Sequence, residues 1–227
     1  RHDTGLVLLK TKGQLEDIKA WDQILIDHQG DWLVDQITHL LSHVIQRVER
    51  TSCSFFALIE GDSCFGGTML ELALACDRQY MLDEDGIEVQ RSPINEGILP
   101  MTTGITRQAC RLLGEVELLE SCLGKFDRMD ASEAEEMGLI TEALDEFDYE
   151  DMVPVAIDER VSLSPDSLTG MEANLRFSGP ENTKSKVFGR LSAWQNWIFI
   201  RPNATGPNGA LTLYGRPERP EFAWDRV

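Results

Sequence analysis

Two unbroken apolar runs predict buried β-strands in the first part of the chain. One lies at residues 5–10 and the other at residues 54–60, where five apolar residues follow one another from Phe55 to Ile59. Continuous runs of this kind are typical of strands that are covered on both faces, as in parallel sheets. A third strand is expected at residues 79–82, ahead of an acidic turn at residues 83–86.

Apolar residues that recur three or four positions apart predict helices around these strands. The clearest helix is residues 32–50, whose apolar stripe comprises Leu33, Ile37, Leu40, Leu41, Val44 and Val48. Further helices are expected at residues 68–76, 105–114, 116–123 and 131–137, and a loop at residues 94–104. The alternation of strands and helices indicates an α/β architecture.

Beyond about residue 150 the character of the sequence changes. Helical segments near residues 151–162 and 183–200 lead into an aromatic tail rich in Pro and Gly. We therefore predict a core at residues 1–150 and a C-terminal helical region with a docking tail at residues 151–227. Trp194 and Trp197 can stack on an adenine or an acyl ring, but their three-residue spacing is more often a docking or core stripe.

Charge and cysteine usage narrow the class of protein. The net charge of −18 argues against nucleic acid and anionic membranes as partners, because both require a basic surface. No run approaches the roughly 18 consecutive apolar residues that a membrane-spanning helix needs. Five cysteines without a CxxC pair indicate a reducing compartment, so a cytoplasmic location is expected.

Two candidate reactive groups have simpler explanations. His39 and His43 lie four positions apart, which can place two metal ligands on one helical face. They fall away from the apolar stripe and no third ligand is near in sequence, so a solvated face is favoured and no metal is expected. Cys64 lies in a glycine loop and can be an activated thiolate, but no basic residue accompanies it, which favours a packed cysteine.

The strongest chemical signal is a glycine-rich loop between the strand at residues 54–60 and the helix at residues 68–76. Gly61, Gly66 and Gly67 let the backbone approach a ligand closely. The first N–H groups of a helix lack partners and favour anions. The phosphate motifs GK[ST] and GxGxxG are both missing. A thioester oxygen that gains negative charge would suit this loop, which would then act as an oxyanion hole.

Glu71 stands among apolar residues in this helix and allows two interpretations. Thr68 and Glu71 form a T-x-x-E pattern, in which the glutamate caps the start of the helix. Alternatively, Glu71 is a general acid or base that faces the ligand of the loop. The residue pattern by itself favours the cap.

Three segments resemble the crotonase (enoyl-CoA hydratase) superfamily. They are GDSCFGGTMLELALACD, INEGILP and ASEAEEMGLITEAL, and the resemblance covers about residues 5–145. It implies a ββα spiral core and an acyl-CoA thioester substrate, with no separate cofactor because CoA is part of the substrate. It implies Glu71 as a catalytic position and a substrate site formed by Gly66, Gly67, Thr68, Ser92, Asn95 and Gly97.

A closer resemblance extends over nearly the whole chain. The phrases SLSPD, FGRLSAWQNWIF and RPNA are similar to the C-terminal half of the ring-opening crotonases that act on aromatic CoA thioesters. This resemblance implies that the complete enzyme opens 2,3-epoxybenzoyl-CoA with water and releases formate, in aerobic benzoate degradation. It also implies an N-terminal crotonase-like half of the same protein as partner, and a homo-oligomer.

The chain departs from the catalytic pattern of the superfamily. Pro93 stands where a second glutamate is expected, and a proline cannot carry a proton. Residues 10–20 replace the first oxyanion stretch. We therefore expect a degenerate second copy that is inactive alone. The alternatives are a stand-alone CoA-binding or scaffold module, and an independent hydratase or isomerase that uses Glu71.

Overall fold

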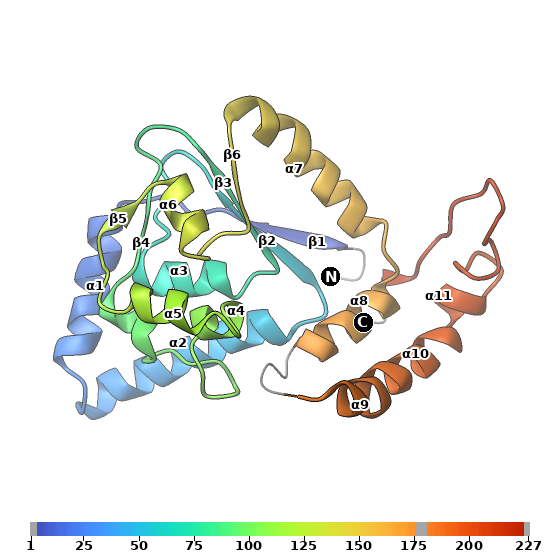
Figure 1. The fold of residues 1–227 in the computed structure, drawn as a ribbon, viewed down its shortest axis with the longest axis horizontal. Coiled ribbons are helices and arrows are strands. Elements are labelled where there is room, and N and C mark those ends of the chain that lie inside the picture. The colour runs from blue at the N-terminus through green and yellow to red at the C-terminus, as the bar shows by residue number, and fades with distance from the viewer. Residues whose placement is uncertain (1–3, 176–180, 225–227) are drawn as a thin grey trace. The chain divides into compact units, whose positions relative to one another are not determined.

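The computed structural model describes residues 4–175 and 181–224 (Figure 1). The chain divides into two compact units. The larger unit comprises Leu8–Glu49 and Phe55–Pro154, and the smaller comprises Arg1–Val7, Arg50–Ser54 and Val155–Val227. The division at residue 150 that the sequence suggested stays a prediction. Residues 176–180 and 225–227 of the predicted C-terminal region lie outside the described part.

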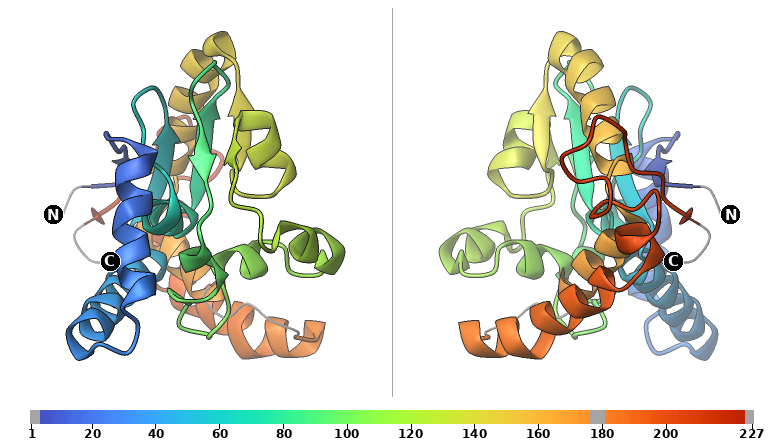
Figure 2. Two further views of the ribbon diagram at one scale, coloured as in Figure 1. Left: turned by 90° about the vertical axis from the view of Figure 1, so that its left-hand side faces the viewer. Right: turned by 90° about the vertical axis from the view of Figure 1, so that its right-hand side faces the viewer.

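A four-stranded sheet confirms the predicted strands. Its order is β1-β2-β3-β6, and the strands are β1 (Leu6–Leu9), β2 (Ser54–Ile59), β3 (Arg78–Leu82) and β6 (Glu142–Leu144). The last three lie side by side and are parallel (Figure 2), with Ala57 opposite Gln79 and Met81 opposite Ala143. Phe56, Ala57 and Ile59 are fully buried, which explains the unbroken apolar run.

The predicted helices of the larger unit are present, with some shifts at their ends. They are α2 (Trp32–Arg50), α3 (Gly67–Leu74), α4 (Arg107–Arg111), α5 (Val116–Cys122) and α6 (Ala131–Glu136). The predicted loop at residues 94–104 overlaps a single 3-10 turn, η1 (Pro93–Glu96). A short antiparallel pair, β4 (Val89–Gln90) and β5 (Arg128–Met129), was not predicted.

The sequence also did not indicate α1 (Leu15–Asp27), which contacts both α3 and η1. Only Leu15, Asp22 and Leu25 of this helix are buried. Leu15, Ile18 and Leu25 do follow a helical spacing, but Asp22 interrupts the apolar face between them.

The apolar stripe of α2 is only partly buried. Ile45 lies in a small core cluster with Leu25, Ile94 and Leu99. Leu33, Leu40 and Val44 remain exposed, with Leu40 64% accessible to solvent. The core therefore covers only one side of this apolar stripe.

A second and larger core cluster lies against the sheet. Its buried members include Phe65, Leu70, Met81, Val89 and Ala134. Phe65 belongs to the glycine-rich loop, and its burial anchors that loop immediately before α3. Phe65 before α3 and Leu70 within it thus pack in the same core cluster.

The smaller unit is helical. It contains the end of α7 (Glu146–Val161), then α8 (Pro165–Leu175), α9 (Thr183–Lys186), the π-helical turn η2 (Val187–Leu191), α10 (Ser192–Phe199) and α11 (Pro202–Thr205). Trp194 and Ile198 of α10 pack against Gly170 of α8. Trp194 and Trp197 meet edge to face, with ring centroids 5.4 Å apart. Among the described residues, no helix is both long enough and apolar enough to cross a membrane.

Candidate functional site

Most of the predicted site residues meet at the start of α3. Gly66 is the N-cap residue of this helix, and Gly67 begins it with a φ of 45°. Ser92 and Asn95 approach from η1, which contacts α3. Gly97 is the exception, because it is the exposed left-handed residue that ends η1.

The anion position at the start of α3 is filled by the side chain of Asp22. The Thr68 N–H donates to Asp22 Oδ2 at 2.9 Å, and the Thr68 hydroxyl donates to Oδ1 at 2.5 Å. The Ser92 hydroxyl donates to Oδ2 at 3.3 Å. Asp22 is 2% exposed. Sequence analysis missed this residue, because nothing in its local pattern connects it with the glycine loop.

Gly67 is required where it stands for two reasons. Its positive φ is a conformation that side chains with a Cβ rarely adopt. A Cβ at this position would also overlap the Asp22 carboxylate and crowd the Ser92 hydroxyl. The glycine thus permits the close approach that the sequence predicted, and the approaching group is a side chain of the same chain.

Burial governs the ionisation of Asp22. Loss of water raises the pKa of this carboxyl above its ordinary value of 3.8, against the opposing effect of the hydrogen bonds from Thr68 and Ser92.

The predicted capping role of Glu71 is wrong. The N-cap residue is Gly66, and it has no side-chain hydrogen bond. Thr68 lies inside the helix and commits its hydroxyl to Asp22. Glu71 is therefore two residues further along the helix than a capping glutamate at the third helical position would be, and it is 2% exposed.

Glu71 binds two side chains that come from other elements. Asn95 Nδ2 donates to Glu71 Oε1 at 2.9 Å. Arg107 Nη1 donates to Glu71 Oε2 at 2.6 Å. Both carboxylate oxygens are therefore engaged within the protein. The catalytic role that the resemblance implied for Glu71 stays a prediction.

Arg107 joins two acidic residues in the interior. Its Nε lies 3.1 Å from Glu49 Oε2, near the end of α2, while its Nη1 contacts Glu71. Burial raises the pKa of Glu71, and the charge of Glu49 adds to this effect. The positive charge of Arg107 and the hydrogen bond from Asn95 act in the opposite direction. Neither Arg107 nor Glu49 was singled out from the sequence.

Ser92 and Asn95 link the Asp22 cluster to the Glu71 cluster. They form a capping box around Pro93, in which Asn95 Oδ1 accepts the Ser92 N–H at 2.8 Å. Asn95 Nδ2 also donates to the Gly67 carbonyl at 2.9 Å. Their observed hydrogen bonds thus hold η1 against the start of α3.

Pro93 is the first residue of the 3-10 turn η1. A proline suits the start of a helical turn, since its missing N–H would have no partner there. At the position where the superfamily pattern has an acidic residue, this chain therefore has a proline that begins a 3-10 turn.

The remaining candidates from the sequence lie apart from these clusters. His39 and His43 are both exposed on α2. No group of three or more His, Cys, Asp or Glu residues that could hold a metal lies in the described part of the chain. Cys64 is buried and its sulfur packs against Gly13, as a packed cysteine would.

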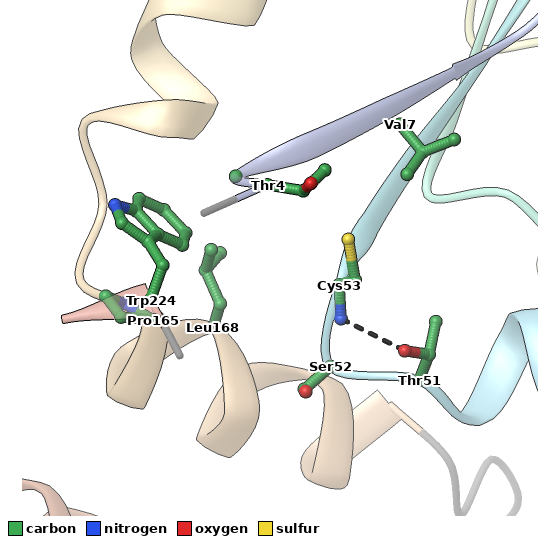
Figure 3. Close-up of a pocket in the computed structure, with 9 residues that line it drawn as sticks. Thr4, Val7, Thr51, Ser52, Cys53, Pro165, Leu168 and Trp224 are labelled. Atoms are coloured by element: carbon green, nitrogen blue, oxygen red, sulfur yellow. Dashed lines mark hydrogen bonds between the residues drawn. The ribbon is translucent and has the colours of Figure 1, made fainter. Parts of the chain in front are cut away.

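Cavities lie elsewhere in the molecule. In the smaller unit, a cavity of about 210 Å³ lies between Cys53, Leu168 and Trp224 (Figure 3). In the larger unit, a cavity of about 520 Å³ includes Glu60 and Tyr149, whose side chains form a 3.0 Å hydrogen bond. Neither cavity is lined by any of the predicted site residues. Because Thr68, Glu71, Ser92 and Asn95 are all buried, the candidate site is a closed polar cluster.

Solved structures identify the fold. An enoyl-CoA hydratase/isomerase from Cupriavidus metallidurans has a TM-score of 0.65 and 16% identity over 98% of this chain and 81% of that chain. An enoyl-CoA hydratase from Geobacillus kaustophilus has a TM-score of 0.63 and 15% identity, covering 96% of this chain and 93% of that chain. A putative enoyl-CoA hydratase from Thermobifida fusca in complex with acetoacetyl-CoA has a TM-score of 0.54 and 18% identity over 73% and 63% of the two chains. The chain has the crotonase fold.

One curated protein shares much more of the sequence. The benzoyl-CoA-dihydrodiol lyase of Aromatoleum evansii is 43% identical over 228 aligned positions, which cover 99% of this chain. The chain spans 41% of the length of that lyase. This share agrees with the length expected for one half of a two-copy protein. No family model matches the chain.

Proposed function

We propose that this chain is the non-catalytic C-terminal half of an enzyme of the benzoyl-CoA-dihydrodiol lyase type. The observation that carries the proposal is the state of Glu71, whose two carboxylate oxygens are bound by Asn95 and Arg107 inside the protein. A general acid or base must come within about 2.6–3.2 Å of the proton that it transfers. Glu71 is buried and already engaged, and Pro93 replaces the expected second acid.

The complete enzyme would open 2,3-epoxybenzoyl-CoA with water and release formate. In this proposal the acid and base groups reside in the N-terminal crotonase-like half. The similarity to the lyase over 99% of the chain supports this assignment, as does the acyl-CoA ligand named for a structural neighbour. CoA enters as part of the substrate, so the chain requires no further cofactor.

An exposed apolar face on α1 and α2 supports a partner of the same protein. This α1–α2 face comprises Trp21, Ile24, Trp32, Leu33, Leu40 and Val44, and Trp32 is 75% exposed. Large apolar side chains exposed in such numbers on two helices are typical of an interface. We assign the remainder of the longer protein as its occupant, because the curated lyase is more than twice as long as this chain.

Complementation tests the proposal. The purified chain is mixed with 2,3-epoxybenzoyl-CoA, alone and after co-expression with the N-terminal half, and formate release is measured. We expect formate only from the co-expressed pair. Turnover by the chain alone that Glu71→Gln abolishes would instead establish an independent hydratase or isomerase. Tight binding of CoA by the chain without any association with the other half would establish a stand-alone binding module.

Two substitutions test the docking face. Leu40→Gln is expected to weaken assembly with the N-terminal half, because it places a polar group in an apolar interface. Phe147→Gln is the matched control, since Phe147 is an exposed apolar residue at the start of α7 and outside the α1–α2 face. Equal assembly of both variants with the wild-type yield would show that this face binds elsewhere or not at all.

A further inference from the structure

The cavity in the smaller unit is lined by four separate segments of the chain. They are the start of β1, the loop before β2, the first turn of α8 and the end of the described chain at Trp224. Figure 3 shows Trp224 and Leu168 on one side of the cavity, and Ser52 and Cys53 on the opposite side. All of these residues belong to the smaller unit. An apolar wall thus faces a wall that carries hydroxyl and thiol groups.

Packing and a hydrogen bond fix both walls. On the apolar side, a Cβ at Gly5 would lie 3.2 Å from Trp224 Cη2, so the glycine makes room for the indole ring. Leu168, in the same wall, is 2% exposed. On the polar side, the Thr51 hydroxyl accepts the Cys53 N–H at 3.2 Å. Because a hydroxyl can accept and donate at the same time, Thr51 can still donate its O–H to a ligand.

The volume and the charge of the lining define the ligand. A cavity of about 150 Å³ with apolar walls is large enough to hold benzene. This cavity, at about 210 Å³, has room for one ring with a small substituent. None of the described residues that line it has a charged side chain. Burial of an unpaired charge is costly, so carboxylates and phosphates are disfavoured here.

An aromatic ring that carries a hydroxyl group matches the two walls. The ring can contact the indole of Trp224, and aromatic pairs are more favourable than their buried area alone implies. The hydroxyl group can meet the hydroxyl groups of Thr51 and Ser52. We propose that the cavity is a binding site for one small uncharged aromatic alcohol of the size of benzyl alcohol. None of its lining residues belongs to the polar cluster at the start of α3, and the inference does not depend on the proposed enzymatic role.

The thiol of Cys53 provides a direct test, because it lines the cavity and is partly exposed. The chain is alkylated with iodoacetamide at increasing concentrations of benzyl alcohol, and the rate at each cysteine is followed by peptide mass spectrometry. At ten times its dissociation constant, benzyl alcohol should slow the alkylation of Cys53 about tenfold, since only the unoccupied cavity exposes the thiol. Cys110 is the internal control, because it is partly exposed in α4 and does not line the cavity.

Two other compounds test the chemical class of the ligand. Benzoate has the same ring but carries a charge, so it should protect neither cysteine. Cyclohexylmethanol keeps the hydroxyl group but lacks an aromatic ring, so it should bind more weakly than benzyl alcohol. Equal protection of Cys53 by benzoate, or by cyclohexylmethanol, would contradict the proposed ligand class.

Substitutions in the two walls test the position of the ligand, with affinity measured by calorimetric titration. Trp224→Ala removes the aromatic partner and should weaken the binding of benzyl alcohol about threefold to tenfold. Trp21→Ala is the matched control, because Trp21 is an exposed tryptophan of the larger unit. Cys53→Leu fills part of the cavity and should abolish binding, whereas Cys110→Leu should leave it intact.

The wall variants also cover a failure to fold. If Trp224→Ala does not fold, the comparison of Cys53→Leu with Cys110→Leu decides. Equal affinity of those two variants for benzyl alcohol would overturn the proposal. The proposal would also be wrong if benzyl alcohol slowed the alkylation of Cys53 and Cys110 equally, or slowed neither.

Discussion

Arg107 Nη1 and Glu71 Oε2 are 2.6 Å apart, and both side chains are almost completely buried. Glu49 contacts the Nε of the same guanidinium at 3.1 Å. The single positive charge of Arg107 therefore interacts with two carboxylates, Glu71 of α3 and Glu49 of α2. This arrangement ties the end of α2 to α3 and α4.

Removing Arg107 should destabilise the protein severely. Arg107→Met leaves Glu71 and Glu49 buried without their shared cation, and loss of one partner of a buried pair costs about 3–5 kcal/mol. Denaturant unfolding measures this loss. Arg47→Met is the control, because Arg47 is exposed on α2 and such changes usually stay within about 0.5 kcal/mol. A variant Arg107→Met that unfolds at the wild-type midpoint would contradict the structural role of the cluster.

Glu71→Gln should affect stability and leave the activity of the assembled enzyme nearly unchanged. The amide keeps the shape of the side chain but loses the charge that Arg107 contacts, so a cost of about 1–3 kcal/mol is expected. Unfolding midpoints and kcat of the co-expressed halves are the two measurements. A fall in kcat of about 100-fold or more, without a change in the midpoint, would indicate acid–base catalysis by Glu71.

The stability contributed by Asp22 should decline as the pH rises. Because burial raises the pKa of this carboxyl above 3.8, the folded protein binds its proton more strongly than the unfolded chain does. The contribution is complete below pH 3.8 and is lost as the pH rises through the folded-state pKa. The free energy of unfolding of wild type minus that of Asp22→Asn should therefore fall from acidic to neutral pH. A difference that grows with pH would mean that the hydrogen bonds outweigh burial.

Gly67→Ala should destabilise the protein through two separable effects. The positive φ costs about 1–2 kcal/mol for a residue with a Cβ, and the clash with Asp22 adds to it. In the Asp22→Gly background the same change should cost less, since the clash with the carboxylate is gone. Gly61→Ala is the control, because no atom lies within 4 Å of a Cβ at Gly61. If Gly67→Ala lowers the free energy of unfolding equally in both backgrounds, the destabilisation comes from the positive φ alone.

Removal of residues 190–227 should prevent assembly with the N-terminal half. Phe199 and Tyr214 expose large rings in this segment, and Tyr214 is 88% exposed. Such rings often supply much of the energy of an interface. Co-purification and ring-opening activity of the truncated pair are measured. Full assembly and activity of the truncated chain would show that the segment packs within its own unit, as Trp224 does against Gly5.

Local patterns in the sequence predicted strands β1, β2 and β3 of the sheet and many of the helices. The strands at residues 54–60 and 79–82 and the helix at residues 32–50 could be found because they depend on the spacing of apolar residues along a short stretch. The helix α1 was not predicted although Leu15, Ile18 and Leu25 follow a helical spacing, and no local pattern singles out the buried Asp22 on its face. Likewise, the spacing along α2 predicted its apolar stripe but not which side of that stripe the core covers.

The sequence by itself determined the glycine loop that opens α3, the departure at Pro93 and the likeness to the crotonases, because each is a property of adjacent residues. Only the tertiary structure decided which groups meet at the site. Asp22 and Thr68 are 46 positions apart, and Arg107 and Glu71 are 36 positions apart. Contacts over such separations arise when packed helices bring distant positions together, and a local sequence pattern does not predict them. For the same reason, the sequence around Glu71 matches a capping pattern, whereas its side chain lies in a buried ion pair with Arg107.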